Sequence, residues 1–393
     1  MNKKRIVSVL LTFIILSSQL PIYAQEKSEE QDEQHDLAPD AQSAILIERD
    51  TGQLLFEKDA NTKRPPASMT KVMTLLLIME AIENEELSLD ETIRISENAA
   101  SMGGSQIFLG AGEEMSVHDL LKGIAIASGN DASVALAERI SGSEEAFVKK
   151  MNDKVTELGL DNTHFQNASG LPADNHYSTS YDMAMIAKEL LKYETITDYT
   201  SIYDDYLRKG EENEFWLVNT NKLVKFYPGV DGLKTGYTNE AKYCLTATAM
   251  KDDMRVIAVV MGADTIKERN ASVSSLLDYA YNHFETQKLF EKGENIRDVE
   301  LFKAEDSQVE MVASQSISTI HKKGESTDDL EVTVNLDNNY ELPMKKGTQT
   351  GTIIVKNDGE VISETPIVTK QNVEKASYMT LFKRTMQSLA KYR

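Results

Sequence analysis

The sequence predicts an α+β domain followed by a small all-β domain. Two β-prone runs open the folded part, long helical runs follow, and strands return near Tyr243. This order is typical of a sheet that carries helices. From about Lys288 the pattern changes to short β-prone runs separated by turn signals. A chain of 393 residues is long enough for two such domains, because domains usually have about 100–200 residues.

The first 40 residues predict an export signal and a flexible spacer. The basic residues Lys3–Arg5 precede the apolar run Ile6–Leu16, and Ile22–Ala24 fits a cleavage site. A membrane-spanning anchor is the alternative, but it needs about 20 apolar residues and polar side chains interrupt this run. We therefore expect residues 1–24 to be removed as a signal peptide. Residues 25–40 are acidic and poor in apolar side chains, which favours a flexible spacer.

Composition excludes several classes of protein. The formal net charge is −21, and it becomes −24 without residues 1–24, which contain three basic residues and no acid. Nucleic acid is therefore not an expected partner. The single cysteine, Cys244, cannot form an internal disulfide, and its apolar, strand-like surroundings indicate a packed thiol rather than a nucleophile. The six histidines show no H-E-x-x-H spacing, so no catalytic metal is expected.

The α+β domain is expected over residues 41–286. The turn signal Asp50–Gly52 between two β-prone runs predicts a hairpin. Helical periodicity then covers four runs: Met69–Ile82, Val117–Ile140, Glu144–Leu158 and Tyr181–Tyr193. Two strands and a final helix follow: Tyr243–Met250, Arg255–Met261 and Ala271–Phe284.

The second domain is expected over residues 288–369, with a helical tail over residues 371–393. Five β-prone runs predict its strands: Val309–Ala313, Ser316–Ile320, Leu330–Leu336, Thr352–Val355 and Val361–Ile367. At helical spacing the tail has one apolar face and one basic face, which predicts a helix lying on an anionic membrane surface. Packing of the apolar face onto the β domain is the alternative.

The first of three short motifs is Ser68-Met69-Thr70-Lys71, which lies at the start of a helical run. Residues three apart on a helix share a face, with Cβ atoms about 5–6 Å apart, so the serine and the lysine can exchange a proton. Serine is a nucleophile only when a base takes its proton, and lysine is a base only when burial or a nearby cation destabilises its ammonium. Lys234 is a candidate for that cation. The backbone N–H of Ser68 at a helix start would face a developing oxyanion.

The second motif, Ser128-Gly129-Asn130, is a polar break in an apolar helical stretch. Its simplest alternative interpretation is that Asn130 or Asp131 caps the next helix. The third motif is Lys234-Thr235-Gly236, whose lysine and hydroxyl suit a carboxylate ligand. Its glycine would let a substrate backbone approach a strand edge closely. A hairpin with a solvated lysine is the alternative for this motif.

In this order the three motifs resemble those of the active-site-serine penicillin-recognising enzymes. Longer segments resemble the low-molecular-weight D-alanyl-D-alanine carboxypeptidases, notably those of spore-forming Gram-positive bacteria: Pro66-Ala-Ser-Met-Thr-Lys-Val-Met-Thr, Gly104-Ser-Gln-Ile-Phe-Leu, Ile126-Ala-Ser-Gly-Asn-Asp-Ala-Ser, Asn167-Ala-Ser-Gly-Leu-Pro and Asp231-Gly-Leu-Lys-Thr-Gly-Tyr-Thr. The resemblance implies a penicillin-binding/β-lactamase-like catalytic domain, an antiparallel sheet with helices, ahead of the β domain.

The resemblance also implies a role for each motif residue. Three would carry out the chemistry: Ser68 as the acylated nucleophile, Lys71 as its proton acceptor and Ser128 as the proton relay to the leaving D-alanine. Five would hold the substrate: Asn130 at the peptide amide, Lys234 and Thr235 at the terminal carboxylate, Gly236 where the substrate backbone approaches the strand edge, and Tyr237 with its N–H in the oxyanion hole beside that of Ser68. No cofactor is implied. One departure is Lys242, where many relatives have glycine.

The activity implied is removal of the terminal D-alanine from peptidoglycan stem pentapeptides, which limits cross-linking, with β-lactams as covalent inhibitors. The enzyme would be exported to the outer face of the cytoplasmic membrane, and the resemblance adds a role in sporulation. One rival is a β-lactamase, which needs a deacylating glutamate; the nearest candidate, Glu157, is interpreted as an ordinary helix end. The other is a penicillin-binding sensor or scaffold that turns over poorly.

Overall fold

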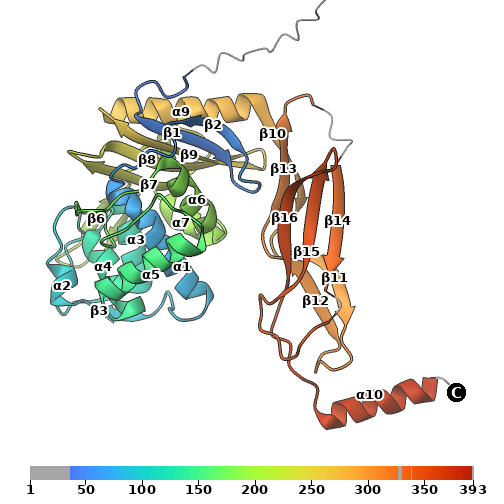
Figure 1. The fold of residues 1–393 in the computed structure, drawn as a ribbon. Helices are drawn as coiled ribbons and strands as arrows, with labels where there is room; N and C mark the ends of the chain where they lie inside the picture. Colours follow the sequence, from blue (N-terminus) through green and yellow to red (C-terminus); the bar gives the residue numbers. More distant parts are fainter. Residues whose placement is uncertain (1–35, 326–329, 338, 392–393) are drawn as a thin grey trace, which may run out of the picture. The chain divides into compact units, whose positions relative to one another are not determined.

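The computed structural model describes residues 36–325, 330–337 and 339–391 (Figure 1). The predicted signal peptide, residues 1–24, and most of the predicted spacer lie outside the described residues. All elements below belong to the unit Leu37–Arg393. Ala38 is fully buried, so the packed structure begins within the last residues of the predicted spacer.

A five-stranded antiparallel sheet forms the centre of the first domain, in the order β2-β1-β9-β8-β7. Its strands are β1 Ser43–Glu48, β2 Leu54–Lys58, β7 Val230–Thr238, β8 Lys242–Lys251 and β9 Met254–Ala263. The predicted hairpin is confirmed, because β1 and β2 pair on either side of Asp50–Gly52. β7, which contains the third motif, is an edge strand with one free side.

Both faces of this sheet are covered, because alternate side chains point to opposite faces. In β1, Ile45 and Ile47 join the larger core while Ala44 and Leu46 join the smaller one. The smaller core lies under α9, Ile266–His283, which runs along one face of the sheet (Figure 1). The larger core packs the other helices against the opposite face, except for α8, Leu223–Phe226, whose Leu223 belongs to the smaller core.

The other α-helices of this domain are α1 Lys71–Glu83, α2 Glu97–Ala100, α3 Val117–Ala127, α4 Asn130–Ser141, α5 Glu144–Glu157, α6 Ser180–Leu190, α7 Thr197–Thr200 and α8 Leu223–Phe226. The long helices among them follow the predicted periodicity with one correction, and the short helices α2, α7 and α8 were not predicted. The run predicted over Val117–Ile140 is two helices, because Ser128 has a left-handed φ of 65° and ends α3. Hydroxyl side chains start several helices: Ser116, Ser143, Thr179 and Thr265 each accept a hydrogen bond from a first-turn N–H.

Two small hairpins and two short 3₁₀ helices complete the first domain. The hairpins are β3 Thr92–Arg94 with β4 Glu114–Ser116, and β5 Asp204–Leu207 with β6 Phe215–Val218. The 3₁₀ helices are η1 Ala67–Thr70 and η2 Glu194–Ile196. The predicted helix at Met69 therefore begins as a 3₁₀ turn that contains Ser68 and continues directly into α1.

The second domain consists of antiparallel strands around an apolar core. β10 Phe284–Phe290 pairs with β13 Ile317–Lys322. A five-stranded sheet has the order β11-β12-β16-β15-β14. Its strands are β11 Asn295–Glu300, β12 Gln308–Ala313, β14 Leu330–Leu336, β15 Gln349–Asn357 and β16 Glu360–Thr369. All five predicted runs lie in strands, whereas β10 and β11 were not predicted because most of their side chains are exposed and polar.

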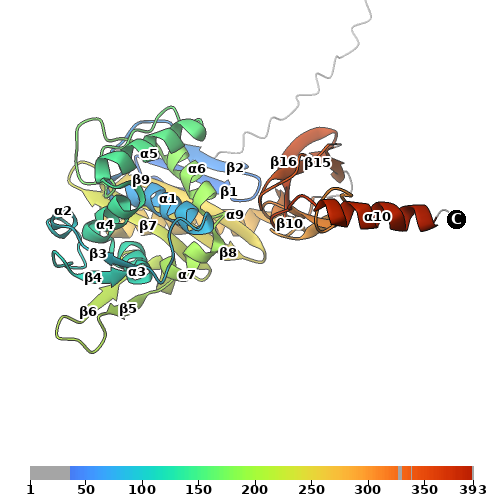
Figure 2. The same ribbon diagram turned by 90° about the horizontal axis from the view of Figure 1, so that it is seen from below.

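The tail forms the predicted helix, α10, but it covers Tyr378–Lys391 and begins later than the predicted residue 371, because Val373 pairs with Met344 and packs into the β-domain core (Figure 2). Its large apolar side chains are exposed: Tyr378, Met379, Phe382, Met386 and Leu389. The alternative, that this face packs onto the β domain, is therefore wrong for these side chains. The helix is held at its other face, where Arg384 donates to the carbonyls of Phe302, Ala304 and Glu305. None of the helices in the described ranges has both the length and the apolar character required to span a bilayer.

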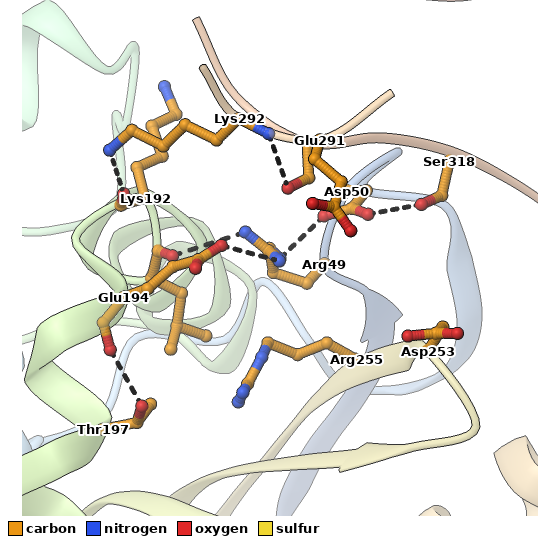
Figure 3. A network of polar contacts seen from close by, with 12 residues as sticks. Arg49, Asp50, Lys192, Glu194, Thr197, Asp253, Arg255, Glu291, Lys292 and Ser318 are labelled. Carbon is orange, nitrogen blue, oxygen red and sulfur yellow. Dashed lines mark hydrogen bonds and ion pairs between the residues drawn. The ribbon is translucent and has the colours of Figure 1, made fainter. Parts of the chain in front are cut away.

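A polar network surrounds the turn after β1 (Figure 3). Arg49 Nε lies 2.7 Å from a carboxylate oxygen of Asp50, and Arg49 Nη2 lies 3.8 Å from Glu194. The second oxygen of Asp50 accepts a hydrogen bond of 2.6 Å from Ser318 Oγ on β13. The turn of the first hairpin is thus fixed by charge as well as by strand pairing.

Candidate active site

Ser68 lies on η1, which is held against β7 and a loop by two glycines. A Cβ on Gly236 would lie 2.7 Å from the carbonyl oxygen of Pro66. A Cβ on Gly170, which has a φ of 84°, would lie 1.9 Å from the carbonyl oxygen of Ala67. The third motif therefore needs glycine for the protein's own packing, an explanation that the sequence did not suggest. This packing places the serine beside the free edge of β7.

Lys71 contacts the serine and is buried within the protein. Its Nζ lies 3.2 Å from Ser68 Oγ, and it donates hydrogen bonds of 2.6 Å to Asn130 Oδ1 and to the carbonyl of Ser169. Burial and, to a smaller extent, the charge of Lys234 hold the pKa of Lys71 well below its usual value, and Asp131 partly opposes them. A neutral amine next to a serine hydroxyl can accept its proton.

The second motif is a tight turn between α3 and α4 that is built around the site. Gly129 is the N-cap of α4, so the interpretation of Asn130 or Asp131 as a simple cap is wrong. Asn130 instead bridges Lys71 and the carbonyl of Gly103, the latter at 2.7 Å. Ser128 Oγ is buried and has no hydrogen-bond partner among the described residues. Such a hydroxyl is available to a substrate group.

Asp131 fixes the segment next to this turn and was not predicted as a site residue. Its carboxylate accepts hydrogen bonds from the backbone N–H groups of Ile107 and Leu109, at 3.0 and 3.1 Å. Asn130 N in turn donates to Ser105 O at 2.7 Å. The loop before α3 and the Ser128 turn are thus held together by buried polar contacts, which position Asn130 for Lys71.

The third motif presents a buried cation at the edge of the sheet. Lys234 is 1% exposed, so the alternative of a solvated lysine is wrong. Burial, with the charge of Arg269, lowers the pKa of Lys234 to about 7. Thr235 donates to Thr220 Oγ1 at 2.8 Å, and Thr220 N donates to Ile126 O at 3.2 Å, which links β7 to α3. Thr220, which the sequence analysis did not identify, therefore connects the third motif to the helix that precedes the second.

Arg269 on α9 is a second residue of the site that the sequence analysis missed. It is 3% exposed, and its guanidinium donates to Asn270 Oδ1 from Nε and Nη2, at 3.0 and 2.8 Å. Burial lowers its pKa to about 10. Among the described residues, Lys234 and Arg269 form no ion pair with an acidic side chain. Buried cations without an acid favour an anionic ligand. An arginine on an otherwise apolar helix face was the signal available in the sequence.

Tyr237 follows the third motif and is half exposed. Its ring stacks on Tyr243 with the ring centroids 4.4 Å apart. The structure thus gathers the predicted residues from η1, α1, the Ser128 turn and β7. Lys71 contacts both Ser68 and Asn130, whereas the Ser128 hydroxyl forms no hydrogen bond with any described residue.

Three other sequence interpretations can be compared with the structure. Cys244 is fully buried and burial raises its pKa to about 11, so it is a packed thiol as predicted. Glu157 is the exposed last residue of α5 and pairs with Lys154 at 2.8 Å, as expected for an ordinary helix end. Lys242 has a φ of 58°, the left-handed region that favours glycine, which gives a physical reason for glycine at this position in the resembled family.

Comparisons with known proteins place both domains in one family. Residues 26–265 match the model of the D-alanyl-D-alanine carboxypeptidase family, and residues 284–375 match that of the penicillin-binding protein 5 C-terminal domain. The chain is 53% identical to D-alanyl-D-alanine carboxypeptidase DacF of Bacillus subtilis, over 99% of this chain and 100% of that protein.

Solved structures agree with this assignment. Penicillin-binding protein 5 from Haemophilus influenzae matches with a TM-score of 0.65 at 32% identity, covering 85% of this chain and 97% of that one. Penicillin-binding protein D2 from Listeria monocytogenes in its ampicillin-bound form matches with a TM-score of 0.56 at 32% identity, covering 62% and 98%.

Proposed function

Because this chain belongs to the D-alanyl-D-alanine carboxypeptidase family, we propose that its residues remove the terminal D-alanine of peptidoglycan stem pentapeptides through an ester on Ser68. The protein is a serine-type D-Ala-D-Ala carboxypeptidase with peptidoglycan as substrate and β-lactams as ligands. The observation that carries the assignment to Ser68 is the buried Lys71 amine, 3.2 Å from its hydroxyl.

The first step is attack on the carbonyl carbon of the penultimate D-alanine. Lys71 takes the hydroxyl proton as Ser68 Oγ forms the new bond, since its lowered pKa makes the amine a base. The carbonyl oxygen becomes an oxyanion, which the N–H groups of Ser68 and Tyr237 stabilise. Asn130, already fixed by Lys71 and Gly103, holds the peptide amide.

The second step is breakage of the peptide bond. The proton that Lys71 took from Ser68 passes through the Ser128 hydroxyl to the leaving nitrogen, so Lys71 becomes a neutral amine again. The buried and unpartnered hydroxyl of Ser128 supports this role. The departing D-alanine has its carboxylate beside Lys234 and Thr235, where the buried cations would otherwise lack an anion. Water then attacks the ester, Lys71 again accepts a proton, and the shortened stem peptide leaves with Ser68 restored.

We also propose where the enzyme acts and what its activity does in the cell. We infer export by residues 1–24, action on the extracytoplasmic side, and attachment to the membrane surface by α10, whose apolar side chains are exposed. Removal of terminal D-alanine would limit cross-linking and so affect cell shape. The similarity to a relative in a spore-forming bacterium supports a role in sporulation.

A single assay separates this function from its rivals. Purified protein is incubated with a diacyl-Lys-D-Ala-D-Ala peptide and free D-alanine is measured over time, with Ser68→Ala as control. Continuous release by the wild type alone is expected. A single equivalent of D-alanine per enzyme would indicate a sensor or scaffold, and rapid repeated hydrolysis of penicillin would indicate a β-lactamase.

A further inference from the structure

A pocket of about 370 Å³ lies next to the catalytic serine and has no role in the mechanism above. Three segments line it: Lys63–Ala67 ahead of Ser68, the loop Gly170–Tyr177, and Thr238 with Glu240 in the turn after β7. Its volume falls in the range of about 300–1,000 Å³ that is usual for small-molecule sites.

The direction of β7 decides which part of the substrate meets this pocket. In the proposed function, the terminal carboxylate lies beside Lys234 and Thr235, and the scissile carbonyl lies beside Tyr237. The stem peptide therefore runs antiparallel to β7. One residue further from its carboxyl end, at about 3.3 Å per residue, the peptide passes Tyr237 toward Thr238. The third stem residue thus lies at the mouth of the pocket.

The walls of the pocket bear charges of both signs. Lys63 and Arg64 come from one segment, Asp174 from the loop and Glu240 from the turn. Over the part of the chain that the structure describes, none of these four side chains forms an ion pair. Lys63 Nζ lies 4.5 Å from the centre of the Tyr177 ring, and the guanidinium of Arg64 donates to Gln42. Lys63, Asp174 and Glu240 are exposed and free to meet a ligand.

The loop that forms one wall is held firmly. Asn167 Oδ1 accepts a hydrogen bond of 2.7 Å from Gly170 N. His176 Nδ1 accepts one of 3.1 Å from Gln166 N, so its proton is on Nε2, which donates to Thr70 Oγ1 at 2.8 Å. Burial lowers the pKa of His176 to about 4, so the neutral ring keeps this arrangement at neutral pH. The wall is therefore preorganised for a ligand.

We propose that this pocket binds the side chain of the third stem residue and selects one that ends in both an ammonium and a carboxylate. Glu240 and Asp174 attract the ammonium, and Lys63 attracts the carboxylate. A lysine side chain satisfies only the acidic wall, and a neutral chain satisfies neither. This inference rests on the proposed function, because the substrate direction follows from the carboxylate site at Lys234.

The test uses three N-acetylated tripeptides that end in D-Ala-D-Ala and differ in the first residue: 2,6-diaminopimelate with its distal ammonium and carboxylate free, lysine, and norleucine. We measure kcat/KM for D-alanine release. Exposed ion pairs contribute about 0.2–1 kcal/mol, so each satisfied charge should raise kcat/KM up to roughly fivefold, in the order diaminopimelate, lysine, norleucine.

Two charge-neutralising variants sharpen the test. Lys63→Gln should remove the advantage of the diaminopimelate peptide over the lysine peptide, and Glu240→Gln should reduce that of the lysine peptide over the norleucine peptide. Lys267→Gln and Glu212→Gln neutralise exposed residues outside the pocket and should preserve the wild-type order. Acylation by benzylpenicillin, which has no third stem residue, should stay within about twofold in all four variants and so reports an intact site.

Two results would overturn the pocket assignment: wild-type kcat/KM values that are equal within experimental error for all three peptides, or variants that slow all three equally. Absence of D-alanine release from every peptide would contradict the proposed function instead. In that case the three peptides are compared as competitors of acylation by a fluorescent penicillin. The same order of protection would still support the pocket, and equal protection would refute it.

Discussion

The α+β domain and the β domain bury different kinds of side chain. The first buries Lys71, Asp131, Lys234 and Arg269 beside its apolar cores. In the second, the buried polar side chains among the described residues are serine and threonine: Ser318, Thr319, Thr350, Thr365 and Thr369. Burying an ionisable side chain costs several kcal/mol, whereas a buried hydroxyl costs less, even where it lacks a hydrogen-bond partner, as those of Thr319 and Thr365 do. The first domain therefore gives up more stability than the second to hold its ionisable groups.

Lys71→Ala should produce the largest effect on activity. Without its base, Ser68 acylation by benzylpenicillin should fall by about 10²–10⁴-fold, as is usual for loss of general-base catalysis. Because Asn130 Oδ1 and the Ser169 carbonyl lose their donor, the melting temperature should also fall, and acylation is therefore measured well below it. The matched control is Lys370→Ala, an exposed lysine of the β domain, which should leave acylation unchanged. Acylation of Lys71→Ala at the wild-type rate would show that another group activates the serine.

Lys234 should give a smaller effect that depends on pH. Its pKa is lowered to about 7, so in the free enzyme the cation is lost as pH rises through this value. Since the cation attracts the terminal carboxylate, kcat/KM for the peptide should fall above pH 7. In Lys234→Arg the guanidinium stays charged, so any activity retained should no longer fall over this range. The measurement is the pH profile of D-alanine release. If kcat/KM falls in the same way above pH 7 in the wild type and in Lys234→Arg, Lys234 is not the group that binds the carboxylate.

Much of this site was predictable from the sequence, for physical reasons that differ between residues. Ser68 and Lys71 were predictable because residues three apart on a helix share a face, although the serine lies on a 3₁₀ turn rather than on the α-helix. The contact between Lys71 and Asn130 was not, because it joins residues 59 positions apart through tertiary packing. Arg269 lies on the buried face of α9, which is a local signal, but its proximity to Lys234 follows only from tertiary packing.

The fold was predictable where periodicity was strong. The alternation in β8 and β9 and the five runs of the β domain matched strands, whereas β7 was not predicted as a strand because glycines interrupt its apolar pattern. The break at Ser128 was visible as polarity, but its left-handed φ and its bond network follow from long-range contacts. Local sequence patterns identify apolar side chains that are buried in a core. They do not identify the polar and charged side chains that are buried in the active site.

A substitution that creates a cavity in the core of the second domain should lower the stability of that domain without changing acylation of Ser68. Ile353 is fully buried in its core, so Ile353→Ala should lower that domain's free energy of unfolding by about 2–5 kcal/mol. Acylation by penicillin should stay within about twofold. Denaturant unfolding and acylation kinetics measured on the same preparation check both parts. A large loss of acylation would mean that the two domains are coupled more strongly than their separate cores indicate.

Removal of α10 should have the smallest effect on catalysis. The truncated chain should end at Ala376, because Val373 is buried in the β-domain core and its loss would confuse the result. Full-length protein should sediment with vesicles rich in anionic lipid, less so at high salt, and the truncated form should stay in solution with unchanged D-alanine release. Equal sedimentation of both forms would contradict a membrane role for the helix.

The central claim is that Ser68 is the nucleophile. The most direct measurement is intact mass after incubation with benzylpenicillin, followed by peptide mapping, for the wild type and Ser68→Ala. The wild type should gain the mass of one drug molecule on the peptide that contains Ser68, because the β-lactam ring opens onto its oxygen. Ser68→Ala should gain none. Covalent uptake of one drug molecule by Ser68→Ala, or an ester mapped to Ser128 in the wild type, would contradict the assignment.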